Sequence, residues 1–81
     1  MPVNVTVRYF AILKEECGQA SEQVRTNATD LASLFAELSA KHHFSLGQDQ
    51  LRVAVNDSFV DWLEAVDEGA QVVFIPPVAG G

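Results

Sequence analysis

Only one stretch of this 81-residue chain has the hydrophobic spacing of a long helix. Thr29 and Asp30 can accept hydrogen bonds from the free amides of a first turn. Apolar side chains then recur at intervals of three and four residues, at Leu31, Leu34, Phe35 and Leu38. Because basic side chains suit the carboxyl end of a helix, the Lys-His-His run at 41–43 predicts a helix end near His43. One helix of this length can cover only one face of a sheet.

Most of the remaining chain alternates apolar and polar residues, as strands with one buried face do. The predicted strands are, in chain order, residues 3–9, 19–26, 51–55, 58–60 and 71–75. Residues 10–16 lose the alternation and lead to Gly18, which predicts a short helical turn with a left-handed cap. The Asn-Asp pair at 56–57 tolerates positive φ and predicts a tight turn. The two prolines at 76–77 cannot donate ladder hydrogen bonds, so they end the last strand.

This order of elements predicts an α+β fold of the ubiquitin-like β-grasp type, a mixed sheet covered on one face by one main helix. In the last strand both sets of alternate residues are apolar, so a helix on one face leaves Val73 and Ile75 uncovered. The uncovered face is a candidate partner interface. We expect a β-grasp domain over residues 1–75 and an extended tail over residues 76–81.

Charge and cysteine content narrow the function classes. Eleven acidic residues against five basic ones give a net charge of −6 without a Lys/Arg cluster, so nucleic acid is not an expected partner. The acidic excess is steepest after Leu51, which suits either a basic partner surface or an ordinary acidic exterior. No apolar run approaches the about 18 residues of a membrane span, and no signal peptide is recognised. With one cysteine and no membrane segment, we expect a cytoplasmic protein.

The C-terminal tail is the segment most suggestive of chemistry. After the prolines it carries only uncharged side chains of decreasing size: Val78, Ala79, Gly80 and Gly81. Six extended residues at about 3.3 Å each reach roughly 20 Å, and the two glycines let another protein enclose the backbone closely. The Gly81 carboxylate is ionised near neutral pH and is a poor electrophile, so it needs activation, for example as an acyl-adenylate. Since the chain has no phosphate loop, ATP would be bound by a separate enzyme. A frayed tail is the alternative.

Three motifs give this chain a resemblance to a known family. They are Arg8-Tyr9-Phe10-Ala11, Ala54-Val55-Asn56-Asp57 and the ending Phe74-Ile75-Pro76-Pro77-Val78-Ala79-Gly80-Gly81. Together they resemble the sulfur-carrier small subunits of molybdopterin synthase, in the MoaD/ThiS family, over essentially the whole chain. The ending is the most specific of the three, because a strand running into Pro-Pro-Val-x-Gly-Gly is more restrictive than Gly-Gly alone.

The resemblance implies a role for the tail. Gly81 would be adenylated by a ubiquitin-activating-type adenylyltransferase and converted to a thiocarboxylate by a sulfur donor system. Residues Pro76, Pro77, Val78, Ala79 and Gly80 would enter the active site of the large synthase subunit. There the sulfur passes to cyclic pyranopterin monophosphate to form molybdopterin. The catalytic side chains would lie on that large subunit, so this chain would be a non-catalytic sulfur-donor subunit. It would hold no stable cofactor, with ATP consumed through the activating enzyme.

The resemblance also implies a docking surface. Phe10, Phe59 and Ile75 match positions where the family has an apolar contact surface, although Ile75 stands in place of an aromatic residue. Other function classes stay open at this point. They are the thiazole-forming sulfur carrier of thiamine synthesis, a ubiquitin-like protein modifier and a β-grasp interaction module without chemistry.

Four other features favour ordinary structural roles. The adjacent histidines His42 and His43 should diverge, so we predict solvated or capping side chains and no metal site. Cys17 has no evident activating base nearby in the sequence and is interpreted as a structural or incidental thiol. Trp62 is expected to pack against the domain edge. The acids between Asp57 and Glu68 are interpreted as a solvated face rather than paired catalytic carboxylates.

Overall fold

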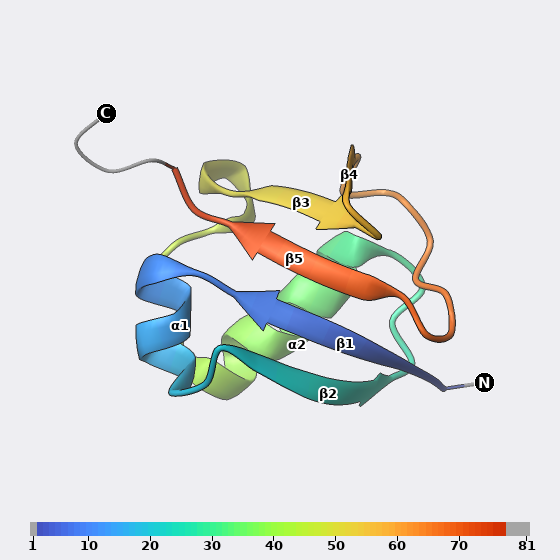
Figure 1. Cartoon of the computed structure of the whole chain (residues 1–81), viewed down its shortest axis with the longest axis horizontal. Coiled ribbons are helices and arrows are strands. Elements are labelled where there is room, and N and C mark those ends of the chain that lie inside the picture. Colours follow the sequence, from blue (N-terminus) through green and yellow to red (C-terminus); the bar gives the residue numbers. More distant parts are fainter. Residues whose placement is uncertain (1, 78–81) are drawn as a thin grey trace.

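A computed structural model describes residues 2–77. The elements are β1 (Val3–Tyr9), α1 (Ala11–Cys17), β2 (Ser21–Thr26), α2 (Leu31–His42), the 3₁₀ turn η1 (Gln48–Gln50), β3 (Arg52–Val55), β4 (Ser58–Val60) and β5 (Gln71–Ile75). The five strands form one sheet in the order β2-β1-β5-β3-β4. Strands β1 and β5 pair in parallel and the other neighbours pair antiparallel, so the sheet is mixed. Figure 1 shows α2 lying across one face of this sheet. The fold is the expected ubiquitin-like β-grasp.

Local sequence signals account for the ends of these elements. Asp30 caps α2 by accepting a hydrogen bond from the Ser33 amide at 2.8 Å, and His43 ends it in the left-handed region at φ 59°. Gly18 ends α1 at φ 87°, where the absence of a Cβ removes the steric cost. The turn between β3 and β4 has positive φ at Asn56 and Asp57, as a tight hairpin of the type I′ class requires. The helix and turn predictions are confirmed.

The core lies between α2 and the sheet. The apolar face of α2 buries the four residues that its spacing predicted, which are Leu31, Leu34, Phe35 and Leu38. The facing side chains of the central strands are also buried, among them Val7, Tyr9, Val72 and Phe74. Trp62 stacks on Phe74 at a centroid distance of 5.7 Å and meets the ring of Phe35 edge-on, so it closes one edge of the core as expected. None of the helices described over residues 2–77 is long and apolar enough to cross a membrane.

Candidate functional site: the open sheet face and the start of the tail

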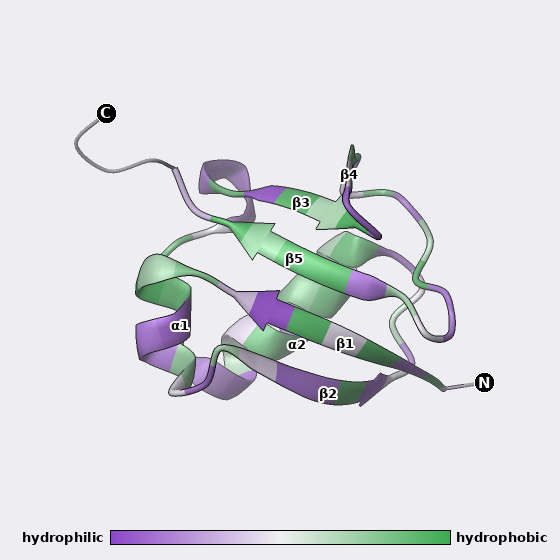
Figure 2. Cartoon of the chain, viewed as in Figure 1, coloured by the Kyte–Doolittle hydropathy of each residue, from purple (hydrophilic) through white to green (hydrophobic). Residues whose placement is uncertain are grey.

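The sheet face opposite α2 carries an apolar hollow. The hollow has a volume of about 260 Å³ and is lined by Arg8, Phe10, Ala54, Asp57, Phe59, Val73 and Ile75. The side chains come from β1 and β5, from β3, β4 and the turn between them, and from the residue just before α1. Figure 2 shows that β5, which crosses the middle of this face, is hydrophobic along most of its length. The three residues of the expected docking surface therefore lie together. We call this hollow and its lining the open face.

Two aromatic side chains of the open face remain largely in solvent. Phe59 is 64% exposed and Phe10 is 45% exposed, while Val73 and Ile75 are half-buried. Removing such side chains from water in a complex is favourable by about 25 cal/mol for each Å² of apolar surface. The open face thus provides apolar area that this chain does not bury by itself.

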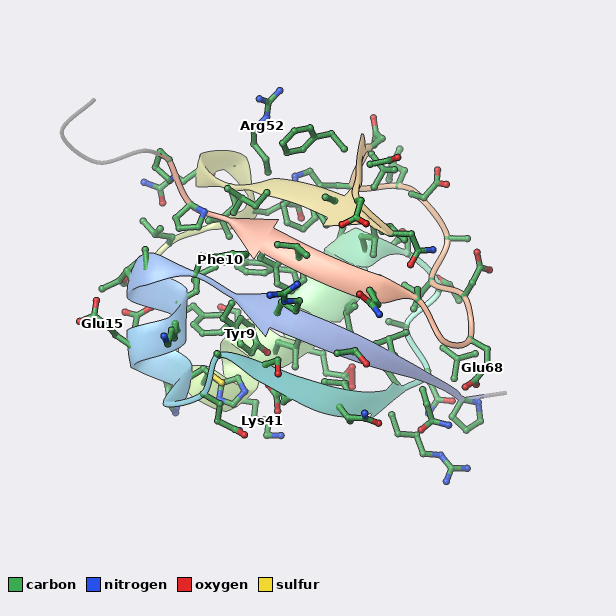
Figure 3. The ribbon with its side chains drawn as sticks, viewed as in Figure 1. Tyr9, Phe10, Glu15, Lys41, Arg52 and Glu68 are labelled. Carbon is green, nitrogen blue, oxygen red and sulfur yellow. The ribbon has the colours of Figure 1, made fainter. Side chains whose placement is uncertain are left out.

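Two of the chain's few basic side chains flank these aromatic rings. The guanidinium of Arg8 lies 5.8 Å from the ring centre of Phe10, and that of Arg52 lies 5.0 Å from the ring centre of Phe59. A guanidinium over a ring face is attracted by the ring's quadrupole, which orders both side chains. In Figure 3, Phe10 lies beside the link from β1 to α1, and Arg52 lies beyond β3. The two guanidinium groups and the Asp57 carboxylate beside an apolar hollow favour a partner with an apolar knob flanked by both acceptor and donor groups.

The tail begins in the middle of the sheet. Ile75, the last residue of β5, pairs with Arg52 on β3, and Phe74 pairs with Tyr9 on β1. Pro76 is buried against the domain, whereas Pro77 is exposed. Val78, Ala79, Gly80 and Gly81 lie outside the described residues.

A polar cluster that the sequence did not suggest lies on the helix-covered side of the sheet, at the edge formed by β2. Glu22 is its centre, because its Oε2 accepts a hydrogen bond from the Tyr9 hydroxyl at 2.5 Å and lies 2.7 Å from His42 Nε2. The sulfur of Cys17 lies 3.7 Å from His42 Nε2 and 3.8 Å from Glu22 Oε2. The Lys41 ammonium lies 3.5 Å from the other carboxylate oxygen. We refer to Tyr9, Cys17, Glu22 and His42 as the Glu22 cluster.

The Glu22 cluster shifts the ionisation of its members. Burial alone would raise the pKa of Glu22, but the hydrogen bonds from Tyr9 and His42 and the charges of His42 and Lys41 outweigh it and lower that pKa. Burial and the neighbouring Glu22 raise the pKa of Cys17, so the free thiol is not an activated nucleophile. Burial and the hydrogen bond to Glu22 raise the pKa of Tyr9 far above its usual range.

This cluster corrects two predictions. His42 is neither solvated nor a cap, since its side chain is only 12% exposed and contacts Glu22, whereas the neighbouring His43 is the exposed capping residue. Cys17 does have a basic side chain nearby, although the base is 25 residues away in the chain. The alternation of inward and outward residues in β2 gave one sequence signal for the Glu22 cluster. Its inward residues are Glu22, Val24 and Thr26, which places a carboxylate at a position where the pattern calls for an apolar side chain.

Comparison with known proteins places the chain in a family. Residues 7–81 match the model of the ThiS family. The chain is 33% identical over 82 residues to the molybdopterin synthase sulfur carrier subunit of Mycobacterium tuberculosis, covering 98% of this chain and 99% of that one. It is 31% identical to a chain in the complex of subunits 1 and 2 of molybdopterin-converting factor from Helicobacter pylori, with a TM-score of 0.67 and coverage of 98% and 100%.

A further structure supports the fold alone. SAMP1 from Haloferax volcanii superposes with a TM-score of 0.80 at 23% identity, covering 96% of this chain and 99% of that chain. The family match extends over most of the chain, and the curated relative agrees with it over its full length. This chain therefore belongs to the ThiS/MoaD family of sulfur carriers.

Proposed function

We propose that this protein is the sulfur carrier subunit of molybdopterin synthase, working through the carboxylate of Gly81. The observation that carries the proposal is the full-length similarity to a molybdopterin synthase sulfur carrier subunit, at 33% identity. The chain's ending, Pro-Pro-Val-Ala-Gly-Gly, supports it because small uncharged residues suit a narrow channel.

The chemistry requires an external enzyme at each step. The Gly81 carboxylate attacks the α-phosphorus of ATP on an adenylyltransferase, which releases pyrophosphate and leaves an acyl-adenylate. A sulfur nucleophile from a donor system then displaces AMP and yields the thiocarboxylate. On the large subunit the sulfur passes to cyclic pyranopterin monophosphate, and hydrolysis of the acyl group returns the carboxylate. This chain contributes the carrier atom and the docking surface, and the catalytic side chains belong to the partners.

The open face is the proposed docking surface for the large subunit and for the adenylyltransferase. Phe10, Phe59 and Ile75 lie beside the strand from which the tail leaves, so a partner that binds there meets the start of the tail. A structure of a relative contains two subunits of molybdopterin-converting factor, which supports a heteromeric assembly of this kind. The exposed Asp57, which lines the open face, favours a partner with a basic side chain at that position.

Intact-protein mass spectrometry tests the proposal. The full chain is incubated with ATP, a sulfur donor and the adenylyltransferase, and the expected product has one terminal oxygen replaced by sulfur. Addition of an oxygen gives almost the same mass change, so fragments must place it on Gly81 and show Met1 and Cys17 unoxidised. An unchanged Gly81, with the enzyme shown active on another carrier, would contradict the proposal.

Deletion of Gly81 provides the matched variant. The buried hydrophobic residues of the described core lie between Val5 and Phe74, so we expect an unchanged melting temperature together with complete loss of molybdopterin formation in a reconstituted synthase. Full activity of the truncated chain would refute a carrier role. If thiazole formation or lysine-linked conjugates appear in place of molybdopterin, the carrier serves a different acceptor.

A further inference from the structure

The structure assigns a second site to this chain: we propose that Cys17, Glu22 and His42 form a binding site for Zn²⁺. The site is separate from the open face and independent of the proposed sulfur transfer. The sulfur, carboxylate oxygen and imidazole nitrogen of these residues all lie within 4.8 Å of one another. They come from the end of α1, the start of β2 and the end of α2, so only the tertiary fold assembles them.

The spacing of the three ligand atoms fits a tetrahedral zinc ion. Zinc bond lengths imply about 3.5 Å from sulfur to each of the other two ligands and about 3.3 Å between nitrogen and oxygen. The sulfur lies 3.7 Å from His42 Nε2 and 3.8 Å from Glu22 Oε2, which are already close to those values. The nitrogen and oxygen are 2.7 Å apart, so this pair must open by about half an ångström to admit the ion.

The ligand types also match zinc better than the harder cations. Thiolate and imidazole favour Zn²⁺ over Mg²⁺ and Ca²⁺, which take oxygen ligands almost exclusively. One thiolate and one carboxylate balance the two positive charges of the ion. Three protein ligands leave a fourth position for water, as in open zinc sites.

The surroundings of the cluster hold Glu22 in place for such a site. The Tyr9 hydroxyl donates to Glu22 Oε2, and Lys41 contacts the other carboxylate oxygen. Hydrogen bonds of this kind orient a metal ligand and typically change metal affinity by about 10- to 100-fold. Figure 3 shows Tyr9 and Lys41 near the end of the molecule that carries α1. The side chains of Glu22 and His42 are 9% and 12% exposed, so the cluster is screened from solvent without being sealed.

Zinc binding would change the protons of the cluster in a defined way. In the metal-free cluster the 2.7 Å contact between Nε2 and an ionised carboxylate requires a hydrogen on Nε2. The ion needs the lone pair of that nitrogen, so the hydrogen on Nε2 is displaced. The Cys17 thiol gives up its proton to solvent when the sulfur–metal bond forms. Zinc binding is therefore coupled to proton release and weakens as the pH falls.

A cobalt titration tests the site. The reduced, EDTA-treated full chain is titrated with Co²⁺, and we expect a sulfur-to-cobalt charge-transfer band that saturates at one equivalent and is abolished by excess Zn²⁺. Zinc at 100 times its dissociation constant should raise the folded-to-unfolded ratio about 100-fold. The histidine nitrogen resonances should show that His42 loses the hydrogen on Nε2 when the ion binds.

Substitutions locate the binding. His42→Gln and Glu22→Gln should each weaken zinc binding at least tenfold, and Cys17→Ala should remove the cobalt band. Tyr9→Phe keeps all three ligands and should weaken binding about tenfold. His43→Asn is the matched control, because it changes the adjacent exposed histidine and should bind as the parent does. Absence of the cobalt band, or equal zinc affinity in the parent and His42→Gln, would overturn the proposal. Circular dichroism of each metal-free variant confirms that it is folded.

Discussion

The open face predicts that Phe59→Ala weakens partner binding more than it weakens the fold. Phe59 is 64% exposed, and a phenylalanine side chain presents roughly 200 Å², so about 130 Å² is free for a partner to cover. At about 25 cal/mol per Å² this area corresponds to about 3 kcal/mol, or about a 200-fold change in Kd, when it is fully buried in the complex. The part buried within the domain is about 70 Å², which limits the loss of folding stability to about 2 kcal/mol.

The assay is calorimetric titration of the purified large subunit with each variant, together with thermal unfolding of the variant alone. Leu63→Ala is the matched control, since Leu63 is 76% exposed but does not line the hollow. We expect this control to bind as the parent does. If Phe59→Ala binds within twofold of the parent, or if Leu63→Ala loses as much affinity, the assignment of the open face as the docking surface is wrong.

Two further predictions concern the fold. The pKa of Glu22 is lower in the folded protein than in the unfolded chain. The ionised Glu22 therefore stabilises the fold above the usual glutamate pKa of about 4.3, and this stabilisation is lost as the pH falls through the pKa of Glu22 in the folded protein. Urea unfolding should therefore show Glu22→Gln less stable than the parent at pH 7, with the difference shrinking below about pH 4; a constant difference would contradict this. Gly18→Ala should cost about 1 kcal/mol, because φ is 87° there and an added Cβ meets nothing within 4 Å, so the cost is backbone strain alone. Gly18→Asn should cost less in the same assay, and equal stability of Gly18→Ala and the parent would refute the reasoning.

Local patterns in the sequence were sufficient to predict the elements and the fold class. Leu31, Leu34, Phe35 and Leu38 define a helix face by their spacing, and alternation defines the strands, because both signals depend only on near neighbours along the chain. The uncovered apolar face also followed from the sequence. Since both sets of alternate residues in β5 are apolar and the chain offers one long helix, one face had to stay open.

Only the tertiary structure decided which side chains meet. The open face combines Phe10, Phe59 and Ile75 through the strand order of the sheet, and the same packing buries Pro76. The Glu22 cluster escaped prediction because Cys17, Glu22 and His42 lie on three different elements. Their contacts depend on the register between β1 and β2 and on where α2 ends over the sheet. The alternation of β2 places Glu22 on the inward face, but its partners on α1 and α2 become its neighbours only when those elements pack.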